Sequence, residues 1–136
     1  MRVVRALVLA AVLVLLAGCA GGGPDCTGAR FWRALMAGNF FETVSHLDAS
    51  SRLGPVEERL SEDTRALAVL PLDVRGVHYQ VSVSGDTATV AVSGEARSRF
   101  GLWLPAREVC QIKLHRDPAQ GWRVVDYSLS LGDLPD

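Results

Sequence analysis

The spacing of apolar residues changes near Pro71, and this change constrains the fold more than any other feature of the sequence. Before Pro71, apolar residues recur at helical spacing, as in Phe31, Trp32 and Leu35, which share one face of a helix. After it, apolar and polar residues alternate, as in residues 77–83, which is the pattern of half-buried strands. Helices followed by strands predict an α+β fold in which the helices pack on one face of an antiparallel sheet.

Three helices are expected in the first half of the chain. Gly38 ends the first of them, because glycine readily takes the left-handed conformation that terminates a helix. Asn39 then begins a short second helix, and Glu42 completes an Asn-x-x-Glu variant of the capping box. Pro55 suits the first position of a third helix over 55–69, which Pro71 prevents from continuing.

Four strands joined by short connections are expected in the second half. Ser84-Gly85-Asp86 has the composition of a tight hairpin turn, and Asp117–Gly121 has that of another turn. Gly94 marks a bulge or bend in the second strand. The last strand begins at Trp122, and its apolar side chains share one face: Val125, Tyr127, Leu129 and Leu131. Consecutive strands with short turns predict an antiparallel meander.

The first 18 residues have the composition of a secretory signal peptide. Arg2 and Arg5 precede an unbroken apolar run over 6–17, which ends in small residues. A helix needs about 20 apolar residues to cross the hydrocarbon core of a bilayer, so this run of 12 is too short to span it. We therefore expect export of the chain and removal of residues 1–18.

The residues at the expected cleavage site, Leu16-Ala17-Gly18-Cys19, resemble the lipobox of bacterial lipoproteins. The resemblance implies cleavage before Cys19, attachment of a diacylglyceryl group to its thiol and, usually, acylation of the new N-terminus. Two or more acyl chains anchor a protein stably. Ala20 is not the aspartate that retains such proteins at the inner membrane, so the resemblance implies the periplasmic face of the outer membrane where the source has two membranes. The alternative is a stray cysteine in an ordinary signal peptide.

The chain then divides into the signal peptide, a lipidated cysteine with a flexible tether over 19–25, and one α+β domain over 26–136. The short tether is rich in glycine and places the domain close to the bilayer. The sequence has 14 basic and 15 acidic residues, so loss of Arg2 and Arg5 leaves 12 against 15 and a formal net charge of −3. Without a basic excess or a run of basic residues, the sequence does not favour a nucleic-acid partner.

Two cysteines remain once Cys19 carries the lipid. Export places Cys26 and Cys110 in an oxidising compartment where disulfides persist, so the simplest expectation is a disulfide between them. The alternative is a pair of free buried thiols. No metal site is expected, because no Cys-x-x-Cys or His-x-x-x-His pair is present and the three histidines are isolated: His46, His78 and His115.

Three segments of the domain resemble the nuclear-transport-factor-2-like (NTF2-like), cystatin-like superfamily and, within it, small bacterial lipoproteins of unknown function. They are FWRALMAGNFFETVSHLDASSR (31–52), SGDTATVAVSG (84–94) and IKLHRDPAQGWRVVDYSL (112–129). The resemblance implies a cone, in which a curved four-stranded antiparallel sheet wraps around the long helix and leaves a pocket at the open end. It also implies dimers through the sheet in many relatives, and catalysis in some, such as ketosteroid isomerase and limonene-epoxide hydrolase.

No catalytic residues carry over from that superfamily. The first-helix tyrosine of the isomerase branch has no counterpart, because Phe31 and Trp32 occupy that helix. Asp126 and Tyr127 are adjacent on a strand, so they point to opposite faces unless a bulge intervenes. The candidates for a pocket or an interface are aromatic, and each also suits the core: Trp32, Tyr79, Trp103 and Tyr127. Of these, Trp103 falls in the apolar stretch FGLWLP, which is expected to be a connection.

The sequence therefore favours a lipid-anchored cell-envelope protein. Its domain is expected to act as a non-catalytic binding or assembly module, without a cofactor, for a protein partner or a small apolar ligand. Two alternatives remain open. One is an enzyme of the isomerase or hydratase kind, which requires a carboxylate with a raised pKa inside the cone. The other is a structural lipoprotein that works as a homodimer.

Overall fold

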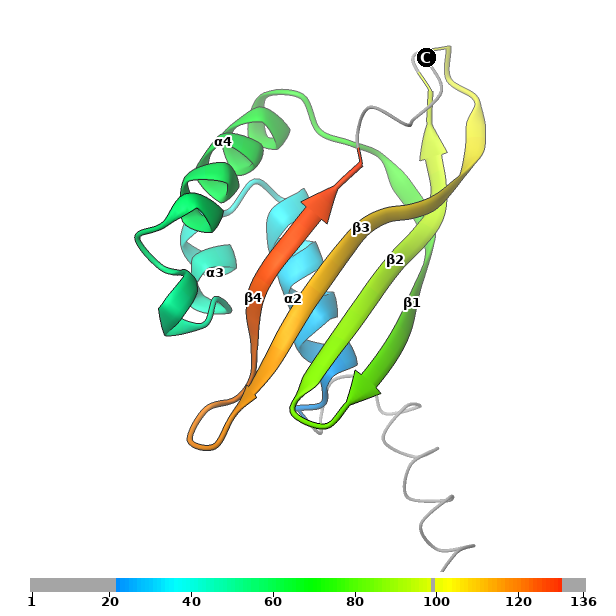
Figure 1. Cartoon of the computed structure of the whole chain (residues 1–136). Coiled ribbons are helices and arrows are strands. Elements are labelled where there is room, and N and C mark those ends of the chain that lie inside the picture. The colour runs from blue at the N-terminus through cyan, green and yellow to red at the C-terminus, as the bar shows by residue number, and fades with distance from the viewer. Residues whose placement is uncertain (1–21, 99, 131–136) are drawn as a thin grey trace, which may run out of the picture.

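The computed structural model describes residues 22–98 and 100–130 (Figure 1). The signal peptide, Cys19 and Leu131 therefore lie outside the described residues. Helices come first and strands later, which confirms the order predicted from the change in apolar spacing. The elements are α2 (Pro24–Met36), α3 (Phe40–Ser45), the short 3-10 helix η2 (Ala49–Ser51), α4 (Pro55–Val69), β1 (Val74–Ser84), β2 (Thr87–Arg97), β3 (Trp103–Asp117) and β4 (Gly121–Leu129).

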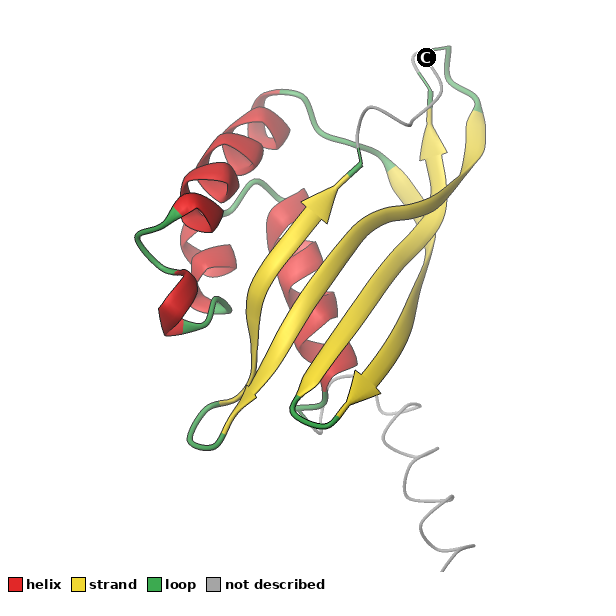
Figure 2. Ribbon diagram, in the orientation of Figure 1, coloured by secondary structure: helices red, strands yellow, loops and turns green. Residues whose placement is uncertain are grey.

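The strands form one antiparallel sheet in the order β1-β2-β3-β4, as predicted for a meander. The sheet is curved, and all three α-helices lie on its inner side, with α2 closest to the strands (Figure 2). The α+β fold with helices packed on a curved four-stranded antiparallel sheet is therefore confirmed. Within the described part of the chain, no helix combines the length and the apolar character needed to cross a bilayer.

The helix ends follow local chemistry. Gly38 takes the left-handed conformation (φ +68°) just after α2. The Asn39 side chain accepts a hydrogen bond from the Glu42 N–H at 3.2 Å, which confirms the predicted cap of α3. The helix α2 already begins at Pro24, within the tether predicted over 19–25, with Gly23 as its N-cap. Proline suits the first helical position, where its missing N–H costs nothing.

A register shift interrupts each of the three strand pairings, in β1–β2 between Arg75 and His78. The pairing of β2 with β3 shifts register between Val92 and Gly94, as the glycine predicted. The pairing of β3 with β4 also shifts, so that Val125 becomes an extra residue between Val124 and Asp126. The expectation that Val125 faces inward is therefore wrong: the bulge turns the neighbouring Val124 inward instead, and that side chain is 0% exposed.

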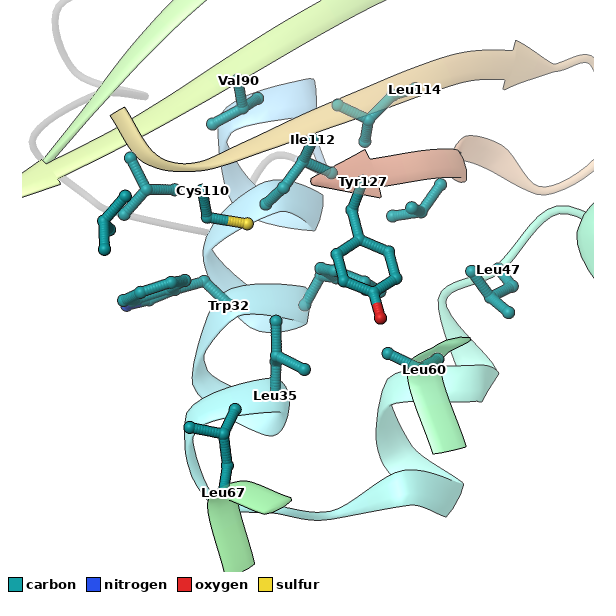
Figure 3. Packing of buried hydrophobic residues seen from close by; sticks show 14 of the residues in the cluster. Trp32, Leu35, Leu47, Leu60, Leu67, Val90, Cys110, Ile112, Leu114 and Tyr127 are labelled. Carbon is teal, nitrogen blue, oxygen red and sulfur yellow. The ribbon is translucent and has the colours of Figure 1, made fainter. Parts of the chain in front are cut away.

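The inner face of the sheet and the apolar side of α2 form the core (Figure 3). The helix approaches β2 closely at Gly28, where an added Cβ would lie 3.0 Å from the side chain of Val90. Phe31 and Leu35, one and two turns further along the helix, are completely buried. Burial of a large apolar side chain stabilises a fold by about 1.5–3 kcal/mol, so this contact dominates the packing.

The outer edge of β4 is covered by the segment between α3 and η2. The Val124 N–H donates to the His46 carbonyl at 2.8 Å, and the Asp48 N–H donates to the Val124 carbonyl at 2.7 Å. These bonds place Leu47 beside Val124 as a short parallel bridge. Covering an edge in this way prevents its free N–H and C=O groups from pairing with another chain.

Truncation of the helix that fills the sheet tests this packing. We expect Leu35→Ala to lower the free energy of unfolding by about 3 kcal/mol, because it removes a buried side chain and leaves a cavity. Leu53→Ala, at a position 94% exposed, is the matched control and should change it by less than about 0.5 kcal/mol. Urea unfolding monitored by circular dichroism measures both. Similar losses for the two variants would contradict the assignment of the core.

Candidate functional site

A tyrosine and an aspartate meet where β4 faces α4. The Tyr127 side chain is almost fully buried, and its hydroxyl donates a hydrogen bond to the Asp63 carboxylate at 2.6 Å. The Phe31 ring of α2 packs against the other side of Tyr127, with ring centroids 5.3 Å apart. The pair therefore joins α4, β4 and α2 at one point inside the domain.

An ion pair lies over this contact. The guanidinium of Arg59, one turn before Asp63 on α4, lies 5.0 Å from the centroid of the Tyr127 ring. It forms a salt bridge with Asp126, whose carboxylate also accepts the Tyr127 N–H at 2.8 Å. The side chains of Arg59 and Asp126 are 47% and 45% exposed, so the bridge contributes at most about 1 kcal/mol.

The bulge at Val125 explains how adjacent residues of β4 reach the same helix. In a regular strand Asp126 and Tyr127 would point to opposite faces. The extra residue twists the strand at this point. As a result Tyr127 enters the core, while Asp126 turns toward Arg59 at the sheet edge.

The surroundings of Tyr127 and Cys110 favour the protonated forms of these two side chains. Burial raises the pKa of Tyr127, and the hydrogen bond to Asp63 and its negative charge raise it further, against the opposing effect of Arg59. Burial and the Asp63 charge also raise the pKa of Cys110 to about 12. A thiol of that pKa is protonated at neutral pH and is a weak nucleophile. In residues 22–98 and 100–130, no group of three metal-ligating side chains comes together.

Buried side chains from the sheet and the helices pack together between the two layers (Figure 3). Cys110, Ile112 and Tyr127 project from the strands toward Trp32 and Leu35 of α2. Beside this cluster, the Tyr127 hydroxyl donates to the Asp63 carboxylate. This hydrogen bond joins β4 to α4 at the edge of the core.

The four predicted aromatic residues do not gather at one site. Trp32 is 3% exposed and lies beside Cys110 in the core, and Tyr127 lies in the same core (Figure 3). Tyr79, on β1, is partly buried against that core. Trp103 belongs to β3 rather than to a connection, and the Arg75 guanidinium lies 4.2 Å from its ring centroid.

The structure does not bring the buried Cys26 and Cys110 together as the predicted disulfide requires. The packing of α2 explains their separation. Its first turn lies further along the sheet, since Thr27 donates to the Trp122 carbonyl, whereas Cys110 lies beside Trp32. Cys26 precedes Trp32 by about 9 Å of helix, and a disulfide needs Cα atoms within about 7 Å.

Arg59 and Asp63 were not among the site residues predicted from the sequence. The signal that would have found Asp63 is its spacing, because it follows the buried Leu60 by three residues and precedes the buried Leu67 by four. Positions with this spacing share one face of a helix. A carboxylate on the apolar face of a helix needs a polar partner, and Tyr127 supplies it.

Outside the core, open hollows lie on the sheet side of the described residues, among them the following two. One, of about 420 Å³, lies between the β1–β2 and β3–β4 turns and is lined by Asp86, Arg116, Asp117, Pro118 and Gly121. Arg116 joins the two turns there by donating to the Asp86 carboxylate at 2.8 Å. The other, of about 300 Å³, lies across the bent part of β1, β2 and β3.

No protein-family model and no curated protein matches the chain. Several solved structures do match it. An NTF2-like protein with a cystatin-like fold from Novosphingobium aromaticivorans is 22% identical, with a TM-score of 0.53 over 92% of this chain and 90% of that one. This chain has the NTF2-like fold.

Two further solved structures share this fold at lower identity. A ketosteroid isomerase-like protein from Shewanella frigidimarina is 16% identical, with a TM-score of 0.57 over 81% of this chain and 95% of that one. A SEC-C motif containing protein from Rhodopseudomonas palustris is 13% identical, with a TM-score of 0.55 over 79% of each chain. At these identities the likeness extends to the NTF2-like fold alone.

The raised pKa of Tyr127 predicts a loss of stability at high pH. Tyrosine in the unfolded chain ionises near pH 10, whereas folded Tyr127 stays protonated beyond that pH. The contribution of protonated Tyr127 to the free energy of unfolding is therefore present below about pH 10 and is lost as the pH rises above that value. In urea unfolding between pH 8 and 11, wild type should lose more stability than Tyr127→Phe. If the free energy of unfolding falls equally with pH in both proteins, the buried hydrogen bond of Tyr127 is contradicted.

The state of the cysteines can be tested by alkylation. Iodoacetamide added to the denatured but unreduced protein should label both Cys26 and Cys110, because the packing of α2 keeps the two residues apart. In the native protein Cys110 should remain unlabelled, since it is buried and protonated. Peptide mass mapping reads both positions. If both cysteines are labelled only after reduction, a disulfide joins them and the separation seen in the structure is contradicted.

Proposed function

We propose that this protein is a lipid-anchored component of the cell envelope whose domain binds a protein partner and catalyses no reaction. The observation that supports the binding role is the continuous cluster of buried side chains that packs between the sheet and the helices (Figure 3). The resemblance of Leu16–Cys19 to a lipobox supports the anchor. A domain held near a membrane with a solid core offers its outer surface for recognition.

The short connection to Cys19 sets the orientation in this proposal. Residues 20–23 span at most about 14 Å when fully extended. The start of α2 lies at the end of the domain that carries the β1–β2 and β3–β4 turns (Figure 1). Thr27 contacts Trp122 at that end. With the anchor in place, these turns face the bilayer and the connection between β2 and β3 points away from it.

The end that points away from the bilayer carries exposed apolar side chains. Phe100 and Leu102, in the connection between β2 and β3, are 74% and 61% exposed. Exposed apolar groups of this kind are a feature of surfaces that bind other proteins. This supports a partner reached from the membrane-distal end.

One observation favours the isomerase or hydratase alternative, namely that the inner surface of α4 carries a carboxylate at Asp63. Its closest partner is the Tyr127 hydroxyl, which donates to it. A base in this position is already engaged, and a tyrosine that donates to Asp63 cannot donate to a substrate carbonyl at the same time. The binding role therefore accounts better for the same contacts.

Photo-cross-linking in the native cell tests the proposal. A photoreactive amino acid at Phe100 should cross-link to a protein partner, because this side chain is exposed at the distal end. The same group at Gln120, in the β3–β4 turn, is the control and should yield lipid adducts rather than that partner.

Mass spectrometry of the same preparations checks the anchor. The mature chain should begin at Cys19 and carry fatty acyl groups, and Cys19→Ser should leave the precursor unprocessed. An N-terminus at Met1, or identical protein adducts from both cross-linking positions, would contradict the proposal.

A further inference from the structure

The outer face of the sheet contains the open hollow of about 300 Å³. It forms because both neighbours of β2 leave regular pairing at the same level. On one side β1 shifts register between Arg75 and His78, and on the other the pairing of β3 shifts between Val92 and Gly94 of β2. The lining comes from three strands: Gly76 and His78, Ser93–Glu95, and Pro105–Arg107.

One arginine lines this hollow and a second lies beside it. Arg107 is part of the lining, and Arg97 lies on the same face of β2 as Glu95, two residues away toward the β2–β3 connection. Both arginines are exposed, and neither forms a salt bridge with a residue in the described ranges. The one carboxylate in the lining, Glu95, is paired with Arg75 at 3.6 Å.

The two layers of the domain differ in charge. Residues 24–73, which hold the helices, contain eight acidic and five basic residues. Residues 74–130, which hold the strands, contain five acidic and seven basic residues. The segment that holds the helices therefore has an acidic excess and the segment that holds the strands a small basic excess, to which the exposed Arg97 and Arg107 belong.

We propose that this hollow and the arginines beside it bind an extended acidic segment of the protein partner. The inference rests on the proposed function for its cellular setting and names the chemistry of the partner. The shape decides between ligands: a single phosphate needs donors that converge on one point, whereas Arg97 and Arg107 lie on different strands along an open surface. An extended chain with acidic side chains on one face matches this layout.

The hollow also adjoins the exposed apolar end of the domain. Arg97 pairs across the ladder with Trp103, directly beside the connection that carries Phe100 and Leu102. The Arg75 guanidinium lies over the Trp103 ring between the two surfaces. A partner can therefore place apolar side chains on the connection and acidic side chains on the hollow. Charge then provides selectivity and the apolar contacts provide affinity.

Fluorescence anisotropy with the full-length lipidated protein in detergent tests the proposal. The probe is a labelled peptide of six Glu-Ser repeats, and the comparison peptide has six Lys-Ser repeats. We expect saturable binding of the acidic peptide only, weakened about tenfold by Arg107→Glu and by Arg97→Glu and weakened by salt. Arg65→Glu, an equal charge change at an exposed position on α4, is the matched control and should alter affinity less than twofold.

Four results would overturn the proposal. The first is that the acidic peptide does not bind. The second is that Arg65→Glu weakens binding as much as Arg107→Glu, which would show that only net charge matters. The third is equal competition by a thymidine dodecamer, which would indicate a surface for any polyanion. The fourth is a dimer in sedimentation equilibrium that Arg107→Glu dissociates, which would assign this face to a second copy of the chain.

Failure of this inference differs from failure of the proposed function. An unlipidated N-terminus would leave the peptide measurement unchanged. Absence of peptide binding would leave the lipid and the cross-links from Phe100 in place.

Discussion

The close packing of α2 on the inner face of the sheet is the contact on which the rest of the structure depends. An antiparallel sheet with one apolar face must cover that face. Gly28 lets the helix approach Val90, and Phe31 and Leu35 then fill the curve of the sheet. Side chains of α2 thereby become part of the same buried cluster as those of the strands.

The polar groups near the core are arranged around this packing. Tyr127 is brought inside by the bulge at Val125, and a hydroxyl buried there would cost free energy without a partner. Asp63 accepts its hydrogen bond from α4, and Arg59 covers the ring and pairs with Asp126 at the sheet edge. The same contacts that satisfy Tyr127 hold α4 against β4. The bulges also bend the sheet outward, and the bend shapes the hollow on the opposite face.

Local chemistry let the sequence predict the elements but not all of their contacts. The Asn39 cap, the helix from Pro55 and the turn at Gly85 depend on neighbours in the chain, and the structure has each of them. The inward face of β4 was predicted one residue too late, because the bulge at Val125 arises from pairing with β3. The predicted disulfide depends on a related tertiary feature. The level at which α2 crosses the sheet separates Cys26 from Cys110, and the spacing of the two cysteines in the sequence does not reveal that level. The Asp63–Tyr127 pair joins residues 64 positions apart and was likewise out of reach.

If the buried cluster between the sheet and the helices is closed to ligands, recognition takes place on the outer surface of the domain, as proposed. Two-dimensional nitrogen–proton NMR of the intact protein, titrated with a panel of apolar ligands such as a steroid and a long-chain alcohol, tests whether the cluster is closed. We expect no saturable shift in the backbone amide signals of Trp32, Cys110 and Tyr127, because their side chains pack together in this cluster. Saturable movement of those three signals together would show that the domain opens to admit a ligand and would contradict a closed core.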